Sequence, residues 1–253
     1  MARYDVVLLD ADMTLLDFER SEGAALRRVL IKWGLPHDDE MCAVYSRINA
    51  ALWDAFARGE VDQDFLVVER YAALLRVCGR EMDPRALNHD YEQFLGEEAF
   101  LLPGAEEFCR ALAGAGLTLA IATNGLPAAQ RGRYARTGLG RYIPHLFISL
   151  ELGAAKPRPA FFDRVLEALS VSDRSRAVMV GDGLATDILG ANRAGLDSIW
   201  YNPRQKPLTG PAVPTWQADS YDRVLAILGV GGKCNGFDTE ISPICNDIGE
   251  GKC

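Results

Sequence analysis

The chain has 253 residues, of which 49% are hydrophobic and 25% charged, and its formal net charge at pH 7 is −8. This length suits an α/β enzyme with an inserted segment, and the apolar content suffices for a sizeable core. The negative charge argues against a nucleic-acid polymer or a lipid surface as the main partner. An apolar run begins at Val6, which leaves no room for a secretory signal, and no run reaches the roughly 20 residues that span a bilayer. We therefore expect neither secretion nor a membrane partner.

The six cysteines bear on the redox compartment. Three of them lie in helical apolar patterns, where we expect small core residues: Cys42, Cys78 and Cys109. The other three fall within the last 20 residues, at spacings that match no zinc motif. The pattern favours reduced thiols, so we expect a cytoplasmic protein.

Short apolar runs alternate with segments of helical spacing. Five runs predict strands: Val6–Leu9, Leu117–Ala122, Leu146–Leu150, Ala177–Val180 and Ser198–Tyr201. Continuous apolar runs of this length fit strands that are covered on both faces of a parallel sheet. Their alternation with helices predicts an α/β fold with a doubly wound, mainly parallel, Rossmann-like sheet.

One segment, from about Phe18 to Gly96, contains only helical patterns. Three apolar stripes at helical spacing predict three helices there. The second stripe consists of Met41, Val44, Tyr45, Ile48 and Leu52. A fourth helix is predicted to begin at Asp83-Pro84, with the aspartate as N-cap and the proline in the first turn.

These patterns predict three parts of the chain. Residues 1–17 and 97–229 are expected to form a discontinuous α/β catalytic core. Residues 18–96 are expected to form an all-α cap domain that is inserted after the first strand. Residues 230–253 are rich in Gly, Asn, Asp and Lys and show no periodicity, which predicts a flexible C-terminal extension.

Four short motifs follow four of the predicted strands, at the strand ends where open α/β sheets place ligands. The first is Asp10-Ala11-Asp12-Met13-Thr14. Its two carboxylates are expected to point onto one small site, where they repel each other unless a divalent cation such as Mg²⁺ binds them. One aspartate can then attack phosphorus while the other serves as acid and base. A turn that contains capping acids would show the same residues.

The other three motifs are weaker when each is taken alone. The hydroxyl and main-chain N–H groups of Thr123-Asn124-Gly125 suit a phosphate oxygen, although Asn-Gly also makes an ordinary turn. Lys156 can neutralise a phosphoryl group, or it is a solvated surface lysine. Asp182 and Asp187 can serve a cation and its water shell, or Asp187 caps the next helix. The four motifs in this order predict a magnesium-dependent phosphoryl-transfer site.

In these motifs the chain resembles the haloacid dehalogenase superfamily of phosphohydrolases, over roughly residues 4–228. The resemblance implies that Asp10 is the nucleophile and a metal ligand. It also implies that Asp12 is the acid and base and binds the metal through its main-chain carbonyl. An insertion after the first motif implies a helical cap that closes over the site.

The resemblance extends to the other motifs. It implies that Thr123 and Asn124 bind phosphate and that Lys156 neutralises it. Asp182 would be the third protein ligand of Mg²⁺, with Asp187 in support. Together these roles imply a phosphatase of small phosphorylated metabolites.

Further stretches, such as Asn49-Ala50-Ala51-Leu52-Trp53, are similar to bacterial pyrimidine 5′-nucleotidases that clear noncanonical nucleotides. The similarity implies a nucleoside monophosphate as substrate. Trp53 and Phe56 can stack on a base, but their i, i+3 spacing equally fits helix packing. Arg70 can bond a base edge, and Gly59 is expected to end a helix and begin a loop that faces the site.

Four alternatives stay open at this stage. The substrate can be another small metabolite, such as a sugar phosphate or phosphoglycolate. Haloacid dehalogenation is a weaker alternative, because by resemblance those enzymes use no metal and lack an acid where this chain has Asp12. A phosphomutase can use the same aspartyl-phosphate. A phosphate-binding module without turnover would need an altered motif, and no key position is missing here.

Overall fold

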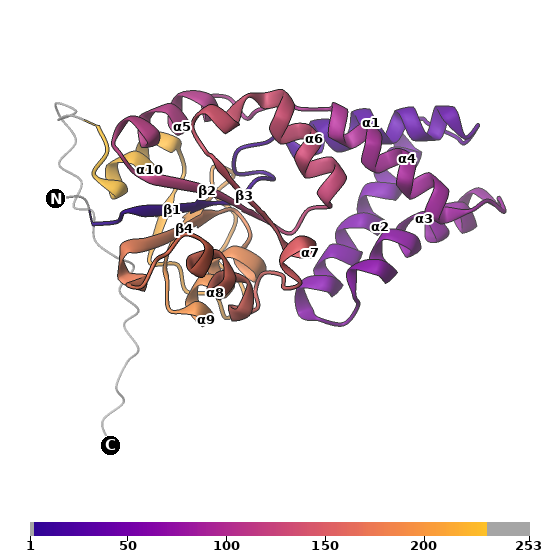
Figure 1. Ribbon diagram of the computed structural model, residues 1–253. Coiled ribbons are helices and arrows are strands. Elements are labelled where there is room, and N and C mark those ends of the chain that lie inside the picture. Colours follow the sequence, from indigo (N-terminus) through magenta and orange to yellow (C-terminus); the bar gives the residue numbers. More distant parts are fainter. Residues whose placement is uncertain (1–2, 232–253) are drawn as a thin grey trace, which may run out of the picture.

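The computed structural model describes residues 3–231. The predicted extension, 230–253, lies outside them apart from its first two residues. Figure 1 shows an elongated molecule with a sheet and its flanking helices at one end and a group of helices at the other. The strands are β1 (Val6–Leu9), β2 (Thr118–Thr123), β3 (His145–Ile148), β4 (Ala177–Gly181), β5 (Asp197–Tyr201) and β6 (Trp216–Ala218).

The helices follow in chain order. The α-helices are α1 (Phe18–Lys32), α2 (Asp39–Arg58), α3 (Gln63–Cys78), α4 (Pro84–Glu97), α5 (Ala105–Gly114), α6 (Pro127–Thr137), α7 (Ser149–Leu152), α8 (Pro159–Ala168), α9 (Leu189–Ala194) and α10 (Tyr221–Leu228). Two short 3₁₀ turns, η1 (Leu139–Arg141) and η2 (Arg174–Arg176), and one π-helical turn, η3 (Leu184–Ile188), complete the described elements.

The six strands form one parallel sheet in the order β3-β2-β1-β4-β5-β6. Successive residues of β1 point to opposite faces, as in any strand. Val7 and Leu9 pack with helices α5 and α10, whereas Val6 and Leu8 pack with α8 and α9. The sheet is therefore covered on both faces, and the predicted doubly wound α/β class is confirmed. The direction of winding reverses between β1 and β4, where such folds place their ligands.

Two details of the strand prediction are wrong. The apolar run Leu146–Leu150 does not continue as a strand beyond Ile148, because the chain turns there into α7 and leaves Leu150 51% exposed. The edge strand β6 was not predicted at all. It has only three residues, of which the middle one, Gln217, is exposed, so it forms no apolar run.

Helices α1 to α4, hereafter the helical unit, have a hydrophobic core of their own, which contains Leu26, Tyr71 and Tyr91. Asp83 caps α4 by accepting a bond from Arg85 N, and Pro84 stands in the first turn as predicted. The second predicted stripe is only partly correct. In α2 the buried residues are Tyr45 and Asn49, and the other four apolar positions of that stripe are half-buried. The reason is that α2 packs mainly along α3, which covers one side of it.

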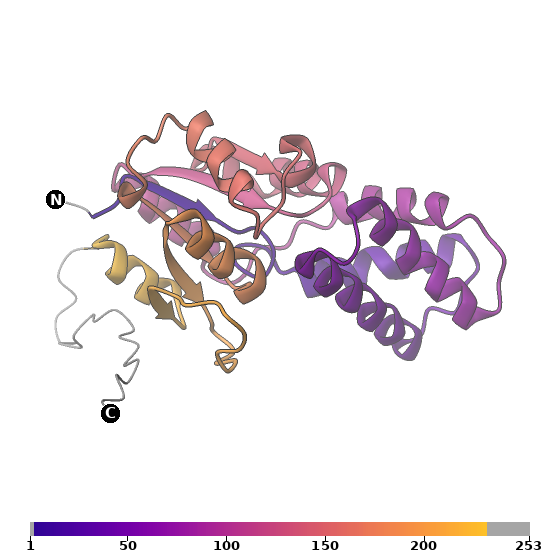
Figure 2. The ribbon, with the colours of Figure 1, turned by 90° about the horizontal axis from the view of Figure 1, so that it is seen from below.

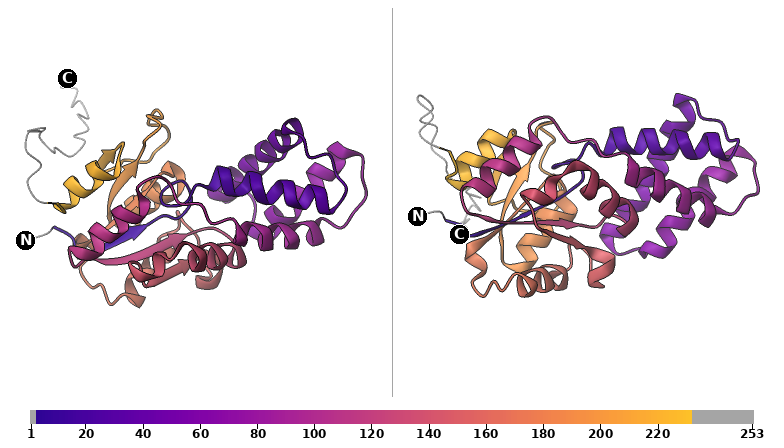
Figure 3. Two further views of the ribbon diagram at one scale, coloured as in Figure 1. Left: turned by 90° about the horizontal axis from the view of Figure 1, so that it is seen from above. Right: turned by 45° about the horizontal axis from the view of Figure 1, so that its top comes forward.

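The helical unit projects from the edge of the sheet at which the strands end (Figures 2 and 3). The chain enters and leaves it through two adjacent segments, in which Asp17 N donates to Phe100 O at 2.9 Å and Leu102 N donates to Leu15 O at 2.9 Å. A second contact joins α4 to α6, which lies beside it in Figure 1. Helix α6 follows strand β2 and so is part of the sheet-containing end of the molecule, and it also contacts the helical unit through α4. The predicted domain boundaries stay a prediction.

The cysteines agree in part with the expectation. Cys109 is buried, whereas Cys42 and Cys78 are half-buried against the core of the helical unit, and all three are free thiols. Within residues 3–231 no helix is both long enough and apolar enough to cross a bilayer.

Candidate active site

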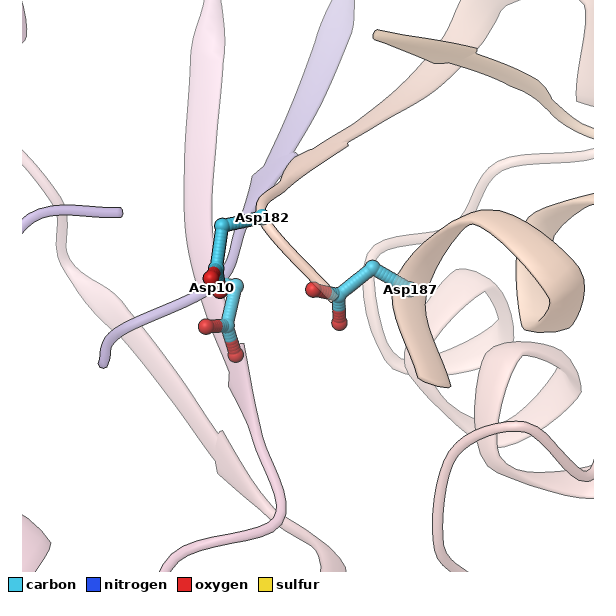
Figure 4. Close-up of side chains that lie close together, drawn as sticks. All are labelled: Asp10, Asp182 and Asp187. Carbon is cyan, nitrogen blue, oxygen red and sulfur yellow. The ribbon is translucent and has the colours of Figure 1, made fainter. Parts of the chain in front are cut away.

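Three carboxylates meet where the sheet changes its direction of winding. Asp10 follows β1, Asp182 follows the neighbouring strand β4, and Asp187 lies in the turn η3. One oxygen atom of each lies within 4.8 Å of the other two. Figure 4 shows Asp10 and Asp182 side by side with Asp187 turned towards them. Asp187 was expected to support the site or to cap the next helix; it lies inside the cluster and does not cap α9.

The lysine of the third motif lies in the centre of this group. Lys156 Nζ donates hydrogen bonds to Asp10 Oδ1, Asp187 Oδ1 and the Ala122 carbonyl oxygen, each at 2.6 Å. Its side chain is only 2% exposed. Burial alone would lower the pKa of the ammonium group, but the two carboxylates outweigh this effect and raise the pKa above its ordinary value. Lys156 therefore stays protonated and is not a surface lysine.

The surroundings disfavour the charged forms of Asp10 and Asp182. Burial, and then the charge of Asp187, raises the pKa of Asp10 well above its usual range, although Lys156 opposes the shift. Burial, followed again by Asp187, raises the pKa of Asp182 to about 6. Lys206 Nζ also lies 3.6 Å from Asp182 Oδ2, so the three acids face two ammonium groups. The donors are all oxygens and an uncompensated negative charge remains, so the residues fit a hard divalent cation such as Mg²⁺.

Glycine permits the approach of Asp187. A Cβ atom on Gly181 would lie 2.2 Å from Asp187 Oδ2, so a larger residue there would push the carboxylate away. Asp187 Oδ2 also accepts a hydrogen bond from Gly183 N at 3.0 Å. The glycines of the fourth motif therefore hold Asp187 against the strand end.

Asp12 agrees with the expectation only in part. Its carboxylate was expected to share one small site with Asp10, and besides burial its charge helps to raise the pKa of both Asp10 and Asp182. Its hydrogen bonds, however, go to helix α6, and it is not among the three clustered acids. The alternation that predicts side-chain direction ends with β1 at Leu9. Beyond it the chain turns, and Met13 has a left-handed φ of 59°. The i, i+2 spacing therefore did not predict which groups hold the Asp12 carboxylate.

Two residues that the sequence reasoning missed hold the Asp12 carboxylate. Gln130 Nε2 donates to Oδ2 at 2.7 Å. The Arg133 guanidinium donates to Oδ1 at 2.7 Å and to Oδ2 at 3.2 Å. Both side chains are buried. A signal was present: the buried face of α6 carries Gln130 and Arg133 at i, i+3 spacing where a packed helix usually has apolar residues.

Thr123 and Asn124 end strand β2 beside Lys156. Thr123 is buried, and its hydroxyl oxygen accepts a bond from Gly125 N at 3.0 Å. The Asn124 amide pairs with the main chain of Lys156: its Oδ1 accepts from Lys156 N at 3.0 Å, and its Nδ2 donates to Lys156 O at 2.8 Å. The side chain of Asn124 therefore ties the second motif to the third.

Thr14, the last residue of the first motif, makes a similar tie. It is buried, and its hydroxyl oxygen accepts a hydrogen bond from Asp182 N at 3.1 Å. Its carbonyl oxygen accepts from the hydroxyl group of Tyr221 at 2.7 Å. The first motif is thereby fixed to the fourth, and the sequence reasoning gave Thr14 no role.

The predicted substrate residues of the helical unit lie in different places. Gly59 ends α2 with a left-handed φ of 78°, as expected. The loop that it begins leads to Gln63, whose Nε2 donates to Asn124 O at 3.3 Å, so this loop borders the second motif. Trp53 and Phe56 are half-buried and pack edge to face on each other, with ring centroids 5.6 Å apart.

Arg70 lies in the interior of the helical unit, where it is 2% exposed. Its Nε donates to Asn88 Oδ1 at 3.0 Å, and a second nitrogen donates to Asn49 Oδ1 at 3.3 Å. The guanidinium carbon also lies 4.7 Å from the ring centroid of Tyr91. Its hydrogen-bonding groups are thus used within the helical unit.

A family model described as haloacid dehalogenase-like hydrolase matches residues 4–195. The chain belongs to this family, as its four motifs indicated. It is 34% identical over 230 residues to the HAD-hydrolase YfnB of Bacillus subtilis, covering 91% of this chain and 97% of that protein. A crystal structure of YfnB bound to magnesium superposes with a TM-score of 0.85, covering 90% of this chain and 100% of that one.

Two nucleotidases are among the relatives that carry a named activity. The pyrimidine 5′-nucleotidase PynA of Streptococcus pneumoniae is 34% identical over 89% of this chain and 95% of its own. The pyrimidine 5′-nucleotidase YjjG of Escherichia coli is 34% identical over 89% of this chain and 98% of its own. The similarity therefore extends over both the sheet and the helical unit.

Proposed function

We propose that the protein is a magnesium-dependent phosphomonoester hydrolase that acts through an aspartyl-phosphate on Asp10. The observation that carries the proposal is the cluster of Asp10, Asp182 and Asp187 around the buried ammonium group of Lys156. Such a cluster offers a nucleophile, oxygen ligands for a cation and a fixed positive charge within one small volume.

The cation site would use a carboxylate oxygen of Asp10, one of Asp182 and the main-chain carbonyl of Asp12, with Asp187 beside them. Mg²⁺, when bound, would neutralise charge on the substrate phosphate. Lys156 would contact a phosphoryl oxygen, with Thr123 and the main chain of Asn124 as further phosphate ligands. These roles follow the family resemblance, and the placement of Lys156 within hydrogen-bonding distance of Asp10 supports them.

The reaction would proceed in two steps. In the first, an Asp10 oxygen bonds to phosphorus, the bond from phosphorus to the leaving oxygen breaks, and Asp12 gives that oxygen a proton. In the second, water bonds to phosphorus and gives its proton back to Asp12. The bond between Asp10 and phosphorus then breaks, inorganic phosphate leaves, and both aspartates return to their starting state.

As substrates we propose pyrimidine nucleoside 5′-monophosphates. Support comes from the two nucleotidases that the chain resembles over nearly its whole described length. Residues 18–96 would act as the cap over the leaving group, and closure of that cap would exclude water. The loop after Gly59 is the part of the cap that borders the phosphate-binding motif, through Gln63 and Asn124. Trp53 and Phe56 precede that loop on α2, where an aromatic face can meet a base.

We also propose that Arg70 acts indirectly, by holding α2, α3 and α4 together, because its bonds go to Asn49 and Asn88. The compartment proposed is the cytoplasm. The free thiols of Cys42, Cys78 and Cys109 fit a reducing environment.

The test is release of inorganic phosphate by the full chain from a panel of phosphomonoesters, with Mg²⁺ or with EDTA. We expect turnover only with Mg²⁺ and the highest kcat/KM for UMP, dUMP or TMP. Asp10→Asn should lose at least about 10³-fold in kcat while its circular dichroism spectrum stays unchanged. Activity that persists in EDTA or in Asp10→Asn would contradict the mechanism. A preference for sugar phosphates or phosphoglycolate would contradict only the substrate.

A further inference from the structure

Helix α6 has an unusual buried face. Its buried residues are Ala129, Gln130 and Arg133, of which two are polar. Arg133 is 1% exposed, and a charged side chain is rarely buried so deeply unless it is paired. Its partner is Asp12, the residue to which the proposed mechanism gives the proton transfers.

The geometry leaves one oxygen of Asp12 partly free. Oδ2 accepts two hydrogen bonds, one from Gln130 and one from Arg133. Oδ1 accepts one, from Arg133 at 2.7 Å. A carboxylate oxygen has two lone pairs, so Oδ1 keeps one for a further partner. The guanidinium group binds both oxygens at once and thereby fixes the plane of the carboxylate as well as its position.

A glycine makes the contact of Gln130 possible. A Cβ atom on Gly125 would lie 2.0 Å from Gln130 Nε2. Gly125 directly follows Thr123 and Asn124, so the loop proposed to bind phosphate also leaves room for the side chain that holds Asp12. The phosphate-binding loop and the support of Asp12 are therefore built by one stretch of chain, from β2 into α6.

We infer that Arg133 and Gln130 are positioning residues that hold Asp12 so that its Oδ1 exchanges the proton with the leaving oxygen and then with water. The inference rests on the proposed function. Because the two residues act through Asp12, their loss should matter only where proton transfer to the leaving group matters.

Two substrates separate this role from a purely structural one. The value of kcat/KM reports on the steps up to departure of the leaving group. A nucleoside leaves as a poor, alkoxide-type group that needs a proton, whereas p-nitrophenolate leaves without one. We expect Arg133→Met to lower kcat/KM for the nucleotide by about 10²-fold and that for p-nitrophenyl phosphate by less than about tenfold. Gln130→Met should show the same pattern with a smaller loss.

Controls and a double variant complete the experiment. Arg131→Met alters an exposed arginine on the same helix that pairs with Glu151, and it should change neither rate. Asp12→Asn should show the same dependence on the leaving group as Arg133→Met, only larger. The double variant should be no slower than Asp12→Asn, because Arg133 has nothing left to position.

Each outcome decides the inference. Equal losses for both substrates, or losses that multiply in the double variant, would overturn it while leaving the phosphatase function intact. If Arg133→Met does not fold, as a lost melting transition would show, Gln130→Met and its double variant with Asp12→Asn decide by the same criteria. A wild-type chain that releases no phosphate from any ester would overturn the proposed function and this inference with it.

Discussion

Gly96 of helix α4 and Gly132 of helix α6 cross with their main chains in contact. A Cβ atom on Gly132 would lie 2.6 Å from the carbonyl oxygen of Gly96 and 2.8 Å from its Cα. No side chain at either position separates the two helices. The contact joins the helical unit to the helix that holds Asp12, so it relates the position of that unit to the proposed acid and base.

Gly132→Ala tests this contact. The methyl group meets main-chain atoms that cannot rotate away, so the helices must separate. We expect a loss of about 1–3 kcal/mol in the free energy of unfolding, measured by thermal melting, together with a lower kcat/KM for phosphomonoesters. Gly23→Ala is the matched control, because Gly23 lies within α1 and a Cβ there has no heavy atom within 4 Å. That variant should gain up to about 1 kcal/mol. Equal melting temperatures of the two variants would contradict the close crossing.

Lys156→Met should remove turnover and also destabilise the metal-free protein. Removing one partner of a buried ion pair typically costs about 3–5 kcal/mol, because the remaining charge stays buried. Here two carboxylates, those of Asp10 and Asp187, would lose their ammonium group. Lys32→Met removes a surface pair with Asp90, for which about 0–1 kcal/mol is expected. Urea unfolding of both variants gives the comparison, and similar losses would contradict the buried pairing.

Asp182→Asn should stabilise the metal-free protein at neutral pH. The folded-state pKa of Asp182, about 6, exceeds the ordinary value of 3.8, so the carboxyl group binds protons more tightly in the folded chain. Its contribution to stability is therefore complete below about pH 4 and is lost as the pH rises through about 6. The difference between the two pKa values corresponds to about 3 kcal/mol at most.

Melting temperatures in EDTA between pH 4 and 8 measure this effect. The advantage of Asp182→Asn over the wild type should grow with pH and level off above about pH 7. Added Mg²⁺ should raise the melting temperature of the wild type and leave that of the variant nearly unchanged, since the variant lacks one proposed ligand. A variant that melts lower than the wild type in EDTA at pH 8 would contradict the assigned electrostatics.

Trp53→Ala distinguishes base stacking from packing. If Trp53 meets the base, its loss should lower kcat/KM for a nucleotide by about tenfold or more, in line with the roughly 1–3 kcal/mol of a base–aromatic contact. The rate with p-nitrophenyl phosphate should then be nearly unchanged. Equal losses would mean that Trp53 serves only the edge-to-face contact with Phe56.

The sequence predicted best those features of the fold that depend on a residue and its neighbours along the chain. Strand β1 has the predicted bounds Val6–Leu9, because a buried central strand must be apolar at each position. Asp83 and Gly59 were placed correctly at helix ends, since capping depends on the residue and its neighbours. Strand β6 was missed because a strand of three residues is too short to show a hydrophobic pattern.

The direction of side chains could not be predicted in the same way. The Asp12 carboxylate is directed to α6 because Gln130 and Arg133 donate hydrogen bonds to it there, and these residues lie more than a hundred positions further along the chain. Arg70 was expected near the substrate, but Asn49 and Asn88 hold it inside the helical unit. For both Asp12 and Arg70 the hydrogen-bond partners determine where the side chain points. Tertiary packing brings those partners close, and the local sequence does not reveal it. The clustering of Asp10 and Asp182, by contrast, follows from the topology of a parallel sheet.

The two hydrogen-bonded segments that contain Asp17 and Phe100 have a consequence for the evolution of such a protein. The chain leaves the sheet and returns to it at neighbouring points, which two main-chain hydrogen bonds hold together. A segment with adjoining ends can be lengthened, shortened or exchanged while strands β1 and β2 keep their register. Under the proposed function, the chemical steps and the choice of leaving group are coded in separable portions of the gene, and a new specificity can arise without rebuilding the nucleophile.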